Sequence, residues 1–509
     1  MKRLKGMVLN FFLVLISVSN LFAQGIIKDD FKVNDDTLKV DQGAPDLDVD
    51  HLGNLVIVWQ DPRKNAADIF AQRLDPSGEI MGTNFLVNNQ LTGDQRFPSV
   101  ACGPLSNLVV VWQDTREGNR DIFAQQISSS GDTLGSNFKV NDDPGTKPQI
   151  EPGVDFSTKV VVVWEDERYD SGDIFGQILD AHCQIEDTNF KINDDHNGSI
   201  QQRPDVASDA IGRFVVVWQD KREGNYDIYA QRFDSSGNFV GNNFKVNDDI
   251  GTSLQNFPKI SSDSLGNFVV VWQDKRNGDE DIYAQAYDWT GEKKADNFRV
   301  NDDQGDAYQG HPDITMDKNG KFVVAWIDKR NEDKDLYAQR YNFNFEPVGK
   351  NFRVNSDTGS AEQSESAVGT DGNRIYFTWT DNRNGNLDIF AKVIEWNLTG
   401  VREVRGDGKL ESLALLQNYP NPFNPYTTIC FAVHRERNTV NSPIPATLKI
   451  YNIKGQVVRR LVDQDLKPGV YVVIWDGKDN RGHEVATGIY FYQLKIRDYT
   501  ESKKMLLLK

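Results

Sequence analysis

Seven tryptophans recur at nearly equal intervals and constrain the fold more than any other feature of the sequence. They are separated by 52 to 54 residues, and the same pattern of residues surrounds each one. Self-similarity at such a period is typical of repeat architectures such as propellers and solenoids. The tryptophans are Trp59, Trp112, Trp164, Trp218, Trp272, Trp326 and Trp379.

Each repeat reads as four short strands. In the fifth repeat we predict strands at residues 258–263, 268–274, 281–288 and 298–302. The second of these is apolar on both faces (Phe-Val-Val-Val-Trp) and must therefore be covered on both sides. The middle strands of a propeller blade lie between two neighbouring blades, and about 50 residues with four strands match one blade. We predict an all-β chain whose residues 24–396 form a seven-bladed β-propeller.

The phase of the repeat predicts how the ring closes. The fourth-strand motif Phe-x-Val/Ile-Asn occurs seven times, but its first copy, at residues 31–36, precedes the first full repeat. The last repeat stops after its third strand, at residues 388–396. We expect the N-terminal copy to complete blade seven as its outer strand and so to join the two ends of the ring.

The N-terminus has the features of a secretory signal. Lys2, Arg3 and Lys5 precede an apolar run at residues 7–18, and Ala23 offers a small residue for cleavage. This pattern predicts a signal peptide over residues 1–23, and no later segment is apolar enough to cross a membrane. The three cysteines (Cys102, Cys183 and Cys430) show no paired spacing, so no disulfide framework is expected.

The charge distribution excludes one class of partner. The chain carries −18, and because residues 1–24 contribute +3 and residues 409–509 contribute +6, residues 25–408 carry −27. Nucleic-acid binding needs a basic face that attracts phosphates. We therefore expect no nucleic-acid partner.

Two charged motifs recur with the repeat. Trp-x-Asp-x-Arg ends the second strand and an aspartate opens the third, and because arginine can bind two carboxylates, we predict a structural ion network that fixes the intervening loop. Asn-Asp-Asp-x-Gly segments follow the fourth strand, and they are read as Asx-turns or, alternatively, as calcium ligands. The network residues are Asp114, Arg116, Asp121, Asp220, Arg222, Asp227, Asp274, Arg276 and Asp281; the calcium candidates are Asp142, Asp143, Asp248, Asp249, Asp302 and Asp303.

No catalytic residue and no cofactor other than this possible Ca²⁺ is predicted. The body contains no GxSxG elbow, no HExxH and no glycine-rich phosphate loop. A ligand site is expected where the repeat symmetry breaks. Candidate positions are Glu165, which replaces glutamine, Gly176, which replaces alanine, and residues 361–366, which replace the proline-opened strand.

The last hundred residues follow a different pattern. After a linker at residues 397–409, short alternating strands predict a β-sandwich over residues 410–509. YPNPFNP (419–425), IYNIKGQVVRRL (450–461), WDGKDNRGHEVATGIYFYQL (475–494) and KKMLLLK (503–509) resemble the type A sorting domain of type IX secretion, which has a FlgD-like immunoglobulin fold. The resemblance implies translocation across the outer membrane by the type IX machinery. It also implies removal of this domain and surface attachment or release.

These features lead to one functional expectation and two alternatives. We expect a secreted or outer-membrane surface protein that binds an extracellular protein or glycan without catalysis, because repeat lengths vary by at most two residues. The alternatives are an extracellular carbohydrate-active hydrolase and a structural or adhesive surface component. The sequence of the body resembles a bacterial seven-bladed propeller of no identified family.

Overall fold

The computed structural model describes residues 25–64, 66–169, 172–195 and 198–396 of the body. In the C-terminal part it describes residues 402–404, 414–415, 418, 421–423, 427–433, 443–467, 469–497 and 499–508. Residues 26–396 form one compact unit, and a second unit begins at Asn397. The predicted signal peptide lies outside the described residues. Within these residues, no helix has the length and apolar character needed to span a membrane.

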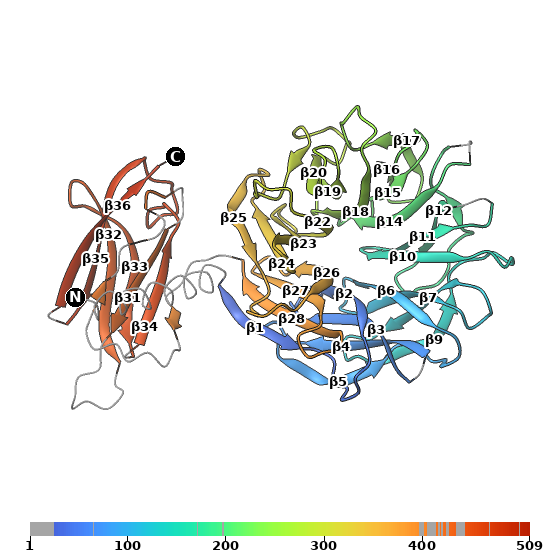
Figure 1. The fold of residues 1–509 in the computed structure, drawn as a ribbon, viewed down its shortest axis with the longest axis horizontal. Helices are drawn as coiled ribbons and strands as arrows, with labels where there is room; N and C mark the ends of the chain where they lie inside the picture. The colour runs from blue at the N-terminus through green and yellow to red at the C-terminus, as the bar shows by residue number, and fades with distance from the viewer. Residues whose placement is uncertain are drawn as a thin grey trace. The chain divides into compact units, whose positions relative to one another are not determined.

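Residues 26–396 form a seven-bladed β-propeller, with seven four-stranded antiparallel sheets arranged in a ring (Figure 1). The first strands of the blades contact one another in succession around the ring and line its centre. They are β2 (Gly43–Val49), β6 (Gln95–Cys102), β10 (Gln149–Phe156), β14 (Gln201–Ser208), β18 (Gln255–Ser262), β22 (Gln309–Met316) and β26 (Gln363–Thr370).

The remaining strands follow outward in chain order in six of the sheets. The second strands are β3 (Leu55–Lys64), β7 (Leu108–Asp114), β11 (Val160–Asp166), β15 (Phe214–Asp220), β19 (Phe268–Asp274), β23 (Phe322–Asn331) and β27 (Arg374–Asp381). The third strands are β4 (Ala66–Leu74), β8 (Asp121–Ile127), β12 (Asp173–Leu179), β16 (Asp227–Phe233), β20 (Asp281–Tyr287), β24 (Asp333–Tyr341) and β28 (Asp388–Glu395). The outer strands are β5 (Ile80–Leu86), β9 (Thr133–Lys139), β13 (Phe190–Lys191), β17 (Phe239–Lys245), β21 (Phe298–Arg299) and β25 (Pro347–Arg353).

Blade seven takes its outer strand from the start of the chain. Strand β1 (Ile26–Lys32) pairs with β28, so the sheet order is β1-β28-β27-β26. The strand begins and ends earlier than the predicted range of 31–36, because the ladder stops where Asn34 turns inward and its side chain accepts the N–H of Ile389 (2.8 Å). The equivalent asparagine after β21, Asn301, accepts the N–H of Ile282 in the same way (2.9 Å).

The hydrophobic cores lie between neighbouring blades. Alternate residues of each second strand point to opposite sides, so that Val162 and Trp164 pack toward blade two, whereas Val161 and Val163 pack toward blade four. All seven repeat tryptophans are fully buried. The continuous apolar run of each second strand is thus explained by burial on both faces.

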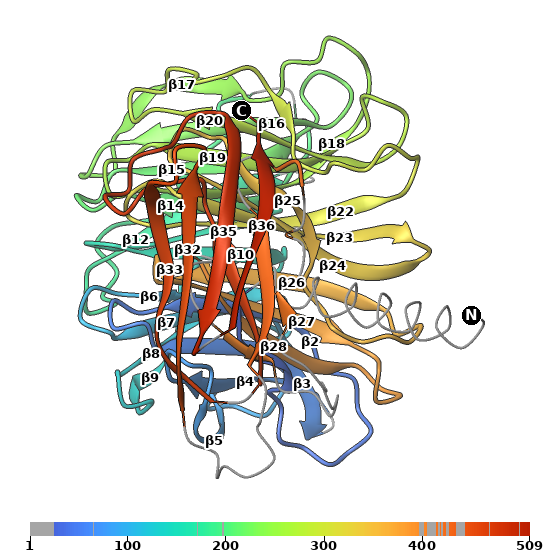
Figure 2. The same cartoon turned by 90° about the vertical axis from the view of Figure 1, so that its left-hand side faces the viewer.

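The C-terminal unit is a two-sheet sandwich. One sheet has the order β29 (Arg402–Val404), β34 (Gly469–Trp475), β31 (Thr427–Val433) and β30 (Ala414–Leu415). The other has the order β33 (Val457–Leu466), β32 (Ile444–Asn452), β35 (Gly488–Ile496) and β36 (Tyr499–Leu507), whose strands lie side by side in Figure 2. Residues 402–404, predicted as linker, pair with the edge of β34 instead. Met505 and Leu507 of the terminal segment are part of the core.

Candidate ligand site at the channel mouth

The Trp-x-Asp-x-Arg residues form a cluster at the end of each second strand. In blade five, Asp274 accepts hydrogen bonds from the Trp272 indole N–H (2.7 Å) and from the backbone N–H and Nη2 of Arg276 (both 2.8 Å). The Arg276 guanidinium also lies over the Tyr283 ring, 4.2 Å from its centroid. These contacts fix the loop between the second and third strands. The same carboxylate–guanidinium bonds join Asp114 to Arg116 and Asp220 to Arg222.

The third-strand aspartates of the predicted network bind other groups. Asp227 is paired with Lys245 Nζ (2.7 Å) and accepts a hydrogen bond from Asn247 Nδ2 (2.8 Å). The arginines of blades three to six take a second carboxylate from the preceding blade. In blade two, Arg116 donates instead to the side-chain oxygen of Asn89 (3.4 Å). Equivalent third-strand pairs are Asp121 with Lys139 and Asp281 with Arg299.

The Asn-Asp-Asp segments supply this second carboxylate. Asp248 lies 2.7 Å from Arg276 of the next blade, so the pair links two blades. Among the described side chains, no three or more of His, Cys, Asp and Glu gather as a metal site requires, so calcium binding stays a prediction. The other first aspartates pair with the next blade as Asp142–Arg168 (3.0 Å) and Asp302–Arg330 (2.9 Å). The second aspartates accept amide hydrogen bonds: Asp143 from Gln149, Asp249 from Asn247 and Asp303 from Asn301.

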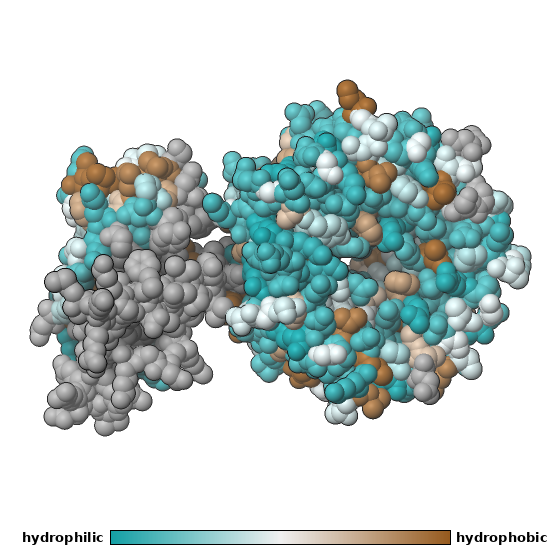
Figure 3. Space-filling model, in the orientation of Figure 1, coloured by the Kyte–Doolittle hydropathy of each residue, from teal (hydrophilic) through white to brown (hydrophobic). Residues whose placement is uncertain are grey.

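The central channel contains a group of carboxylates that the sequence analysis did not identify. Figure 3 shows a mostly hydrophilic face of the propeller with an opening at its centre. Each channel aspartate accepts the backbone N–H of the next blade's first strand, so the carboxylates tie adjacent blades together. The pairs are Asp46 with Val100 (2.9 Å), Asp48 with Cys102 (2.6 Å), Asp155 with Ser208, Asp205 with Ile260 (2.9 Å) and Asp313 with Val368 (2.7 Å).

Lys259 is the cation among these carboxylates. Its Nζ lies 3.6 Å from Asp205, and the Asp205 charge raises the pKa of Lys259. Burial raises the pKa of Asp48 and of Asp313 to about 7. Burial also raises the pKa of Asp46, which lies at the same place in its strand as Asp205 and Asp313. The channel therefore holds several carboxylates that resist ionisation and one cation that partly compensates them.

The mouth of the channel, where the first strands begin, has a repeated backbone and varied side chains. A register shift, with one extra residue on the first strand, occurs near the start of each of these strands. At this bulge each blade places a non-glycine residue in the left-handed region, with φ between 46° and 55°. We call these seven the mouth residues: Ala44, Phe97, Glu151, Arg203, Phe257, His311 and Glu365.

Four of the mouth residues contact one another in sequence. The Arg203 guanidinium is 3.4 Å from the Glu151 carboxylate and lies over the Phe257 ring at 4.4 Å from its centroid. The rings of Phe257 and His311 are 4.2 Å apart, and burial lowers the pKa of His311. Blades three to six thus present one continuous charged and aromatic rim.

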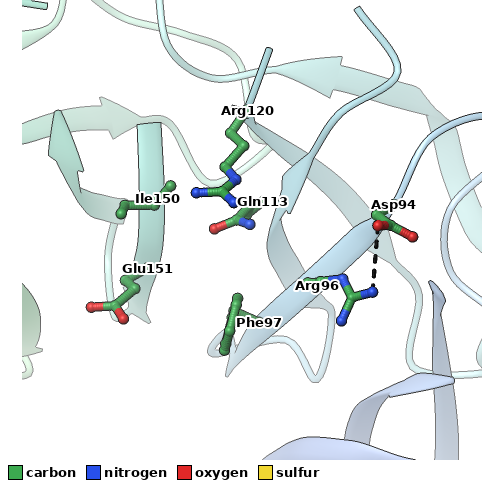
Figure 4. Close-up of a pocket in the computed structure, with 7 residues that line it drawn as sticks. All are labelled: Asp94, Arg96, Phe97, Gln113, Arg120, Ile150 and Glu151. Carbon is green, nitrogen blue, oxygen red and sulfur yellow. Dashed lines mark hydrogen bonds and ion pairs between the residues drawn. The ribbon is translucent and has the colours of Figure 1, made fainter. Parts of the chain in front are cut away.

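A pocket of 510 Å³ opens beside this rim between β6 and β10 (Figure 4). The Phe97 side chain, 41% exposed, stands near the start of β6, and Glu151 lies across from it on β10. Arg120 and Gln113 lie close together at one side of the pocket. The lining residues are Asp94, Arg96, Phe97, Gln113, Arg120, Ile150 and Glu151.

The positions of broken symmetry have different structural roles. Glu165 is 2% exposed, and burial raises its pKa to about 7, with the neighbouring Glu151 charge acting in the same direction. It accepts a hydrogen bond from Gln202 Nε2 (3.2 Å). Gly176 leaves room for the Phe190 ring, which would lie 3.0 Å from an added Cβ. Residues 361–366 contribute the mouth residue Glu365, which accepts the N–H of Ala44 (2.7 Å) and so links blade seven to blade one.

Comparison with known proteins gives a family match in the C-terminal unit alone. The model of the FlgD Ig-like domain matches residues 437–501. No curated protein matches the chain.

Three similar solved structures share 10 to 15% identity with this chain. A protein of unknown function from Dyadobacter fermentans has 10% identity and a TM-score of 0.44, over 72% of this chain and 98% of its own. PorZ, described as a surface component of the type-IX secretion system of Porphyromonas gingivalis, has 15% identity and a TM-score of 0.42, over 91% and 59%. The GH93 α-L-arabinofuranosidase of Fusarium graminearum has 12% identity and a TM-score of 0.43, over 72% and 98%.

Proposed function

We propose that this chain is a secreted or cell-surface protein that binds an extracellular glycan at the channel mouth without catalysis. The observation that carries the proposal is the set of mouth residues. Seven blades repeat the same left-handed bulge, yet the side chains placed there are aromatic, acidic, basic or small. Constant backbone with varied side chains is what a single ligand site on a symmetric ring requires, because one ligand cannot meet seven identical surfaces.

The shape of the site favours a glycan over a protein partner. The pocket of 510 Å³ is within the usual range for small-ligand sites, about 300–1,000 Å³. It combines the exposed Phe97 ring with charged and amide groups that can bind hydroxyls. A protein partner would instead need a contact surface of roughly 800 Å² on each side.

The hydrolase alternative rests on Glu165 and Glu151. A carboxyl with a pKa of about 7 beside a second carboxyl is suited to acid catalysis. However, a general acid must come within hydrogen-bond reach of the substrate, and Glu165 is 2% exposed. The second carboxylate, Glu151, is paired with Arg203. This geometry favours binding over hydrolysis. If the chain were a hydrolase, it would release reducing ends from its glycan substrate, and Glu151→Gln would abolish that release.

We also propose that residues 410–509 direct export by type IX secretion. The sequence resemblance to a type A sorting domain and the FlgD Ig-like match at residues 437–501 support this role. Deleting residues 410–509 in a bacterium that has this system is expected to leave the protein in the periplasm. Secretion of the truncated chain would overturn the proposal.

The test of glycan binding is an array of extracellular glycans probed with the full chain, with calcium and with chelator. Phe97→Ala is expected to weaken binding about ten-fold or more, because aromatic faces in binding sites carry much of the binding energy. Phe343→Ala is the matched control, since this ring is 63% exposed in the β24–β25 turn. Absence of glycan binding, or equal loss in both variants, would contradict the proposal and favour a protein ligand or a structural or adhesive role.

A further inference from the structure

The pocket between β6 and β10 is distinguished from the equivalent places in other blades by two arginines. Arg96 precedes a mouth residue, and Arg120 precedes the third-strand aspartate. At the position of Arg96 the other blades carry Gly43, Ile150, Gln202, Asn256, Gly310 and Ser364. At the position of Arg120 they carry Ala67, Gly172, Tyr226, Glu280, Lys334 and Leu387.

Neither arginine is strongly neutralised. Arg96 is 3.4 Å from Asp94, and both side chains are nearly half exposed, so water screens this pair. Arg120 is exposed, and within the described residues no carboxylate lies within ion-pairing distance of it. The cation at the equivalent position of blade six, Lys334, is by contrast paired with Glu362 at 3.5 Å. Two available guanidinium groups therefore line one pocket.

These two guanidinium groups stand out against the acidic body of the protein. Residues 25–408 carry −27, so the body as a whole repels anions. An anion can bind here only through short-range contacts with Arg96 and Arg120. Because Asp94 and Glu151 also line the pocket, a singly charged carboxylate is favoured over a doubly charged phosphate.

The other lining groups indicate what carries the carboxylate. The Phe97 ring offers an apolar face to the C–H groups of a sugar ring, and the nearby Gln113 amide and Glu151 carboxylate can bind hydroxyls. A guanidinium recognises a carboxylate through two parallel hydrogen bonds. We propose that this pocket binds a hexuronate residue of an acidic extracellular polysaccharide. The inference rests on the proposed glycan-binding function and names its ligand class.

The test is calorimetric titration of the full chain with trigalacturonate, and with oligomers of glucuronate and mannuronate, in the presence of chelator. At least one of these is expected to bind, and the neutral galactotriose is expected to bind much more weakly. Arg96→Gln and Arg120→Gln should each weaken binding about 10- to 100-fold, because each removes a charge-assisted hydrogen bond. Lys334→Gln is the matched control, since it removes the same charge from the same position of blade six.

The outcomes separate this inference from the proposed function. If neutral glycans bind in a Phe97-dependent manner but no uronate binds, glycan binding stands and the hexuronate inference falls. If uronates bind equally well to both arginine variants, the ligand lies elsewhere and the inference also falls. In a further titration, binding of an acetylated tripeptide with a free C-terminal carboxylate is compared with binding of its C-terminal amide. Arg120-dependent binding of the free carboxylate without uronate binding would identify a peptide site instead. Binding of no glycan at all would overturn both proposals.

Discussion

Glu165 occupies a position where four other blades carry glutamine. Burial raises its pKa from 4.5 to about 7. Between pH 4.5 and pH 7 the Glu165 carboxyl is deprotonated in the unfolded chain but still protonated in the folded protein. The free energy of unfolding therefore falls as pH rises through this range, and it stays lower above pH 7. Glu165→Gln should remove this loss. We expect the variant to exceed wild type in free energy of unfolding by roughly 3 kcal/mol at pH 8, with little difference near pH 4.5.

Denaturant titrations of both proteins at several pH values between 4.5 and 8 measure this effect. The charged groups around Glu165 are Glu151, Glu167 and Arg203, and they are unchanged in the variant. Glu292→Gln, at an exposed position, is the control and should follow wild type throughout. A constant difference between Glu165→Gln and wild type across this pH range would show that Glu165 is ionised in the folded protein.

Some residue contacts can be predicted from the sequence, and others cannot. Asp274 and Arg276 could be predicted as partners because their spacing recurs in every repeat. The mouth residues could not, because they share a backbone conformation and no residue type. Six of the mouth residues precede a proline, and this shared position is the sequence signal by which they could have been found. The second carboxylate on Arg276 was missed since it comes from Asp248 in another blade, a contact that only the closed ring creates.

At the scale of elements, strand β1 is held in place by Asn34. Its side chain donates to Asp388 (2.9 Å) and Gln42 (3.0 Å) and accepts from Ile389 (2.8 Å), residues that are distant in sequence or lie in the next blade. Asn34→Ala is expected to release β1 and to speed amide hydrogen exchange in β28 about ten-fold or more. The physical reason is that only the closure of the whole ring keeps β1 near β28.

Asn247→Ala is the matched control for this prediction. Asn247 is equally buried and makes the equivalent bonds, including 2.8 Å from its Oδ1 to the N–H of Ile228. However, the strand before it, β17, follows its partner β16 after a short turn and stays tethered to it. Exchange in β16 should therefore rise less than exchange in β28. Equal effects in the two variants would mean that the covalent tether contributes little to holding an outer strand.

The pairing of the two chain ends in blade seven could be predicted from the sequence, but the exact bounds of the strand could not. The phase of the repeat was enough to predict an outer strand supplied by the N-terminus, because one fourth-strand motif precedes the first full repeat and the last repeat lacks one. The strand bounds were wrong by several residues, since the switch from backbone to Asn34 side-chain bonding has no signature in hydrophobic patterning. The β29 edge strand was missed for a related reason: three residues carry too little periodicity to identify a strand.

At the scale of the whole molecule, the channel brings together charges from five blades. Asp46, Asp155, Asp205 and Asp313 come from four different blades, and Lys259 comes from a fifth. Residues separated by one to five repeats meet only when the ring is complete, so their interaction is a property of the closed propeller. The same carboxylates accept backbone N–H groups of the next blade. Their ionisation therefore affects the contacts that hold neighbouring blades together.

Lys259 should therefore stabilise the ring in a pH-dependent way. Its charge opposes the burial that raises the pKa values of Asp46, Asp205 and Asp313. In Lys259→Met these values should rise further, so stability is lost as pH increases through them and is retained at low pH, where the carboxyls are protonated. We expect the thermal unfolding midpoint to fall by several degrees, roughly 5 °C, at pH 8 and by much less at pH 5. Lys318→Met, at an exposed position, should leave both midpoints unchanged. A fall of equal size at both pH values would mean that the Lys259 side chain stabilises the channel by packing and not by its charge.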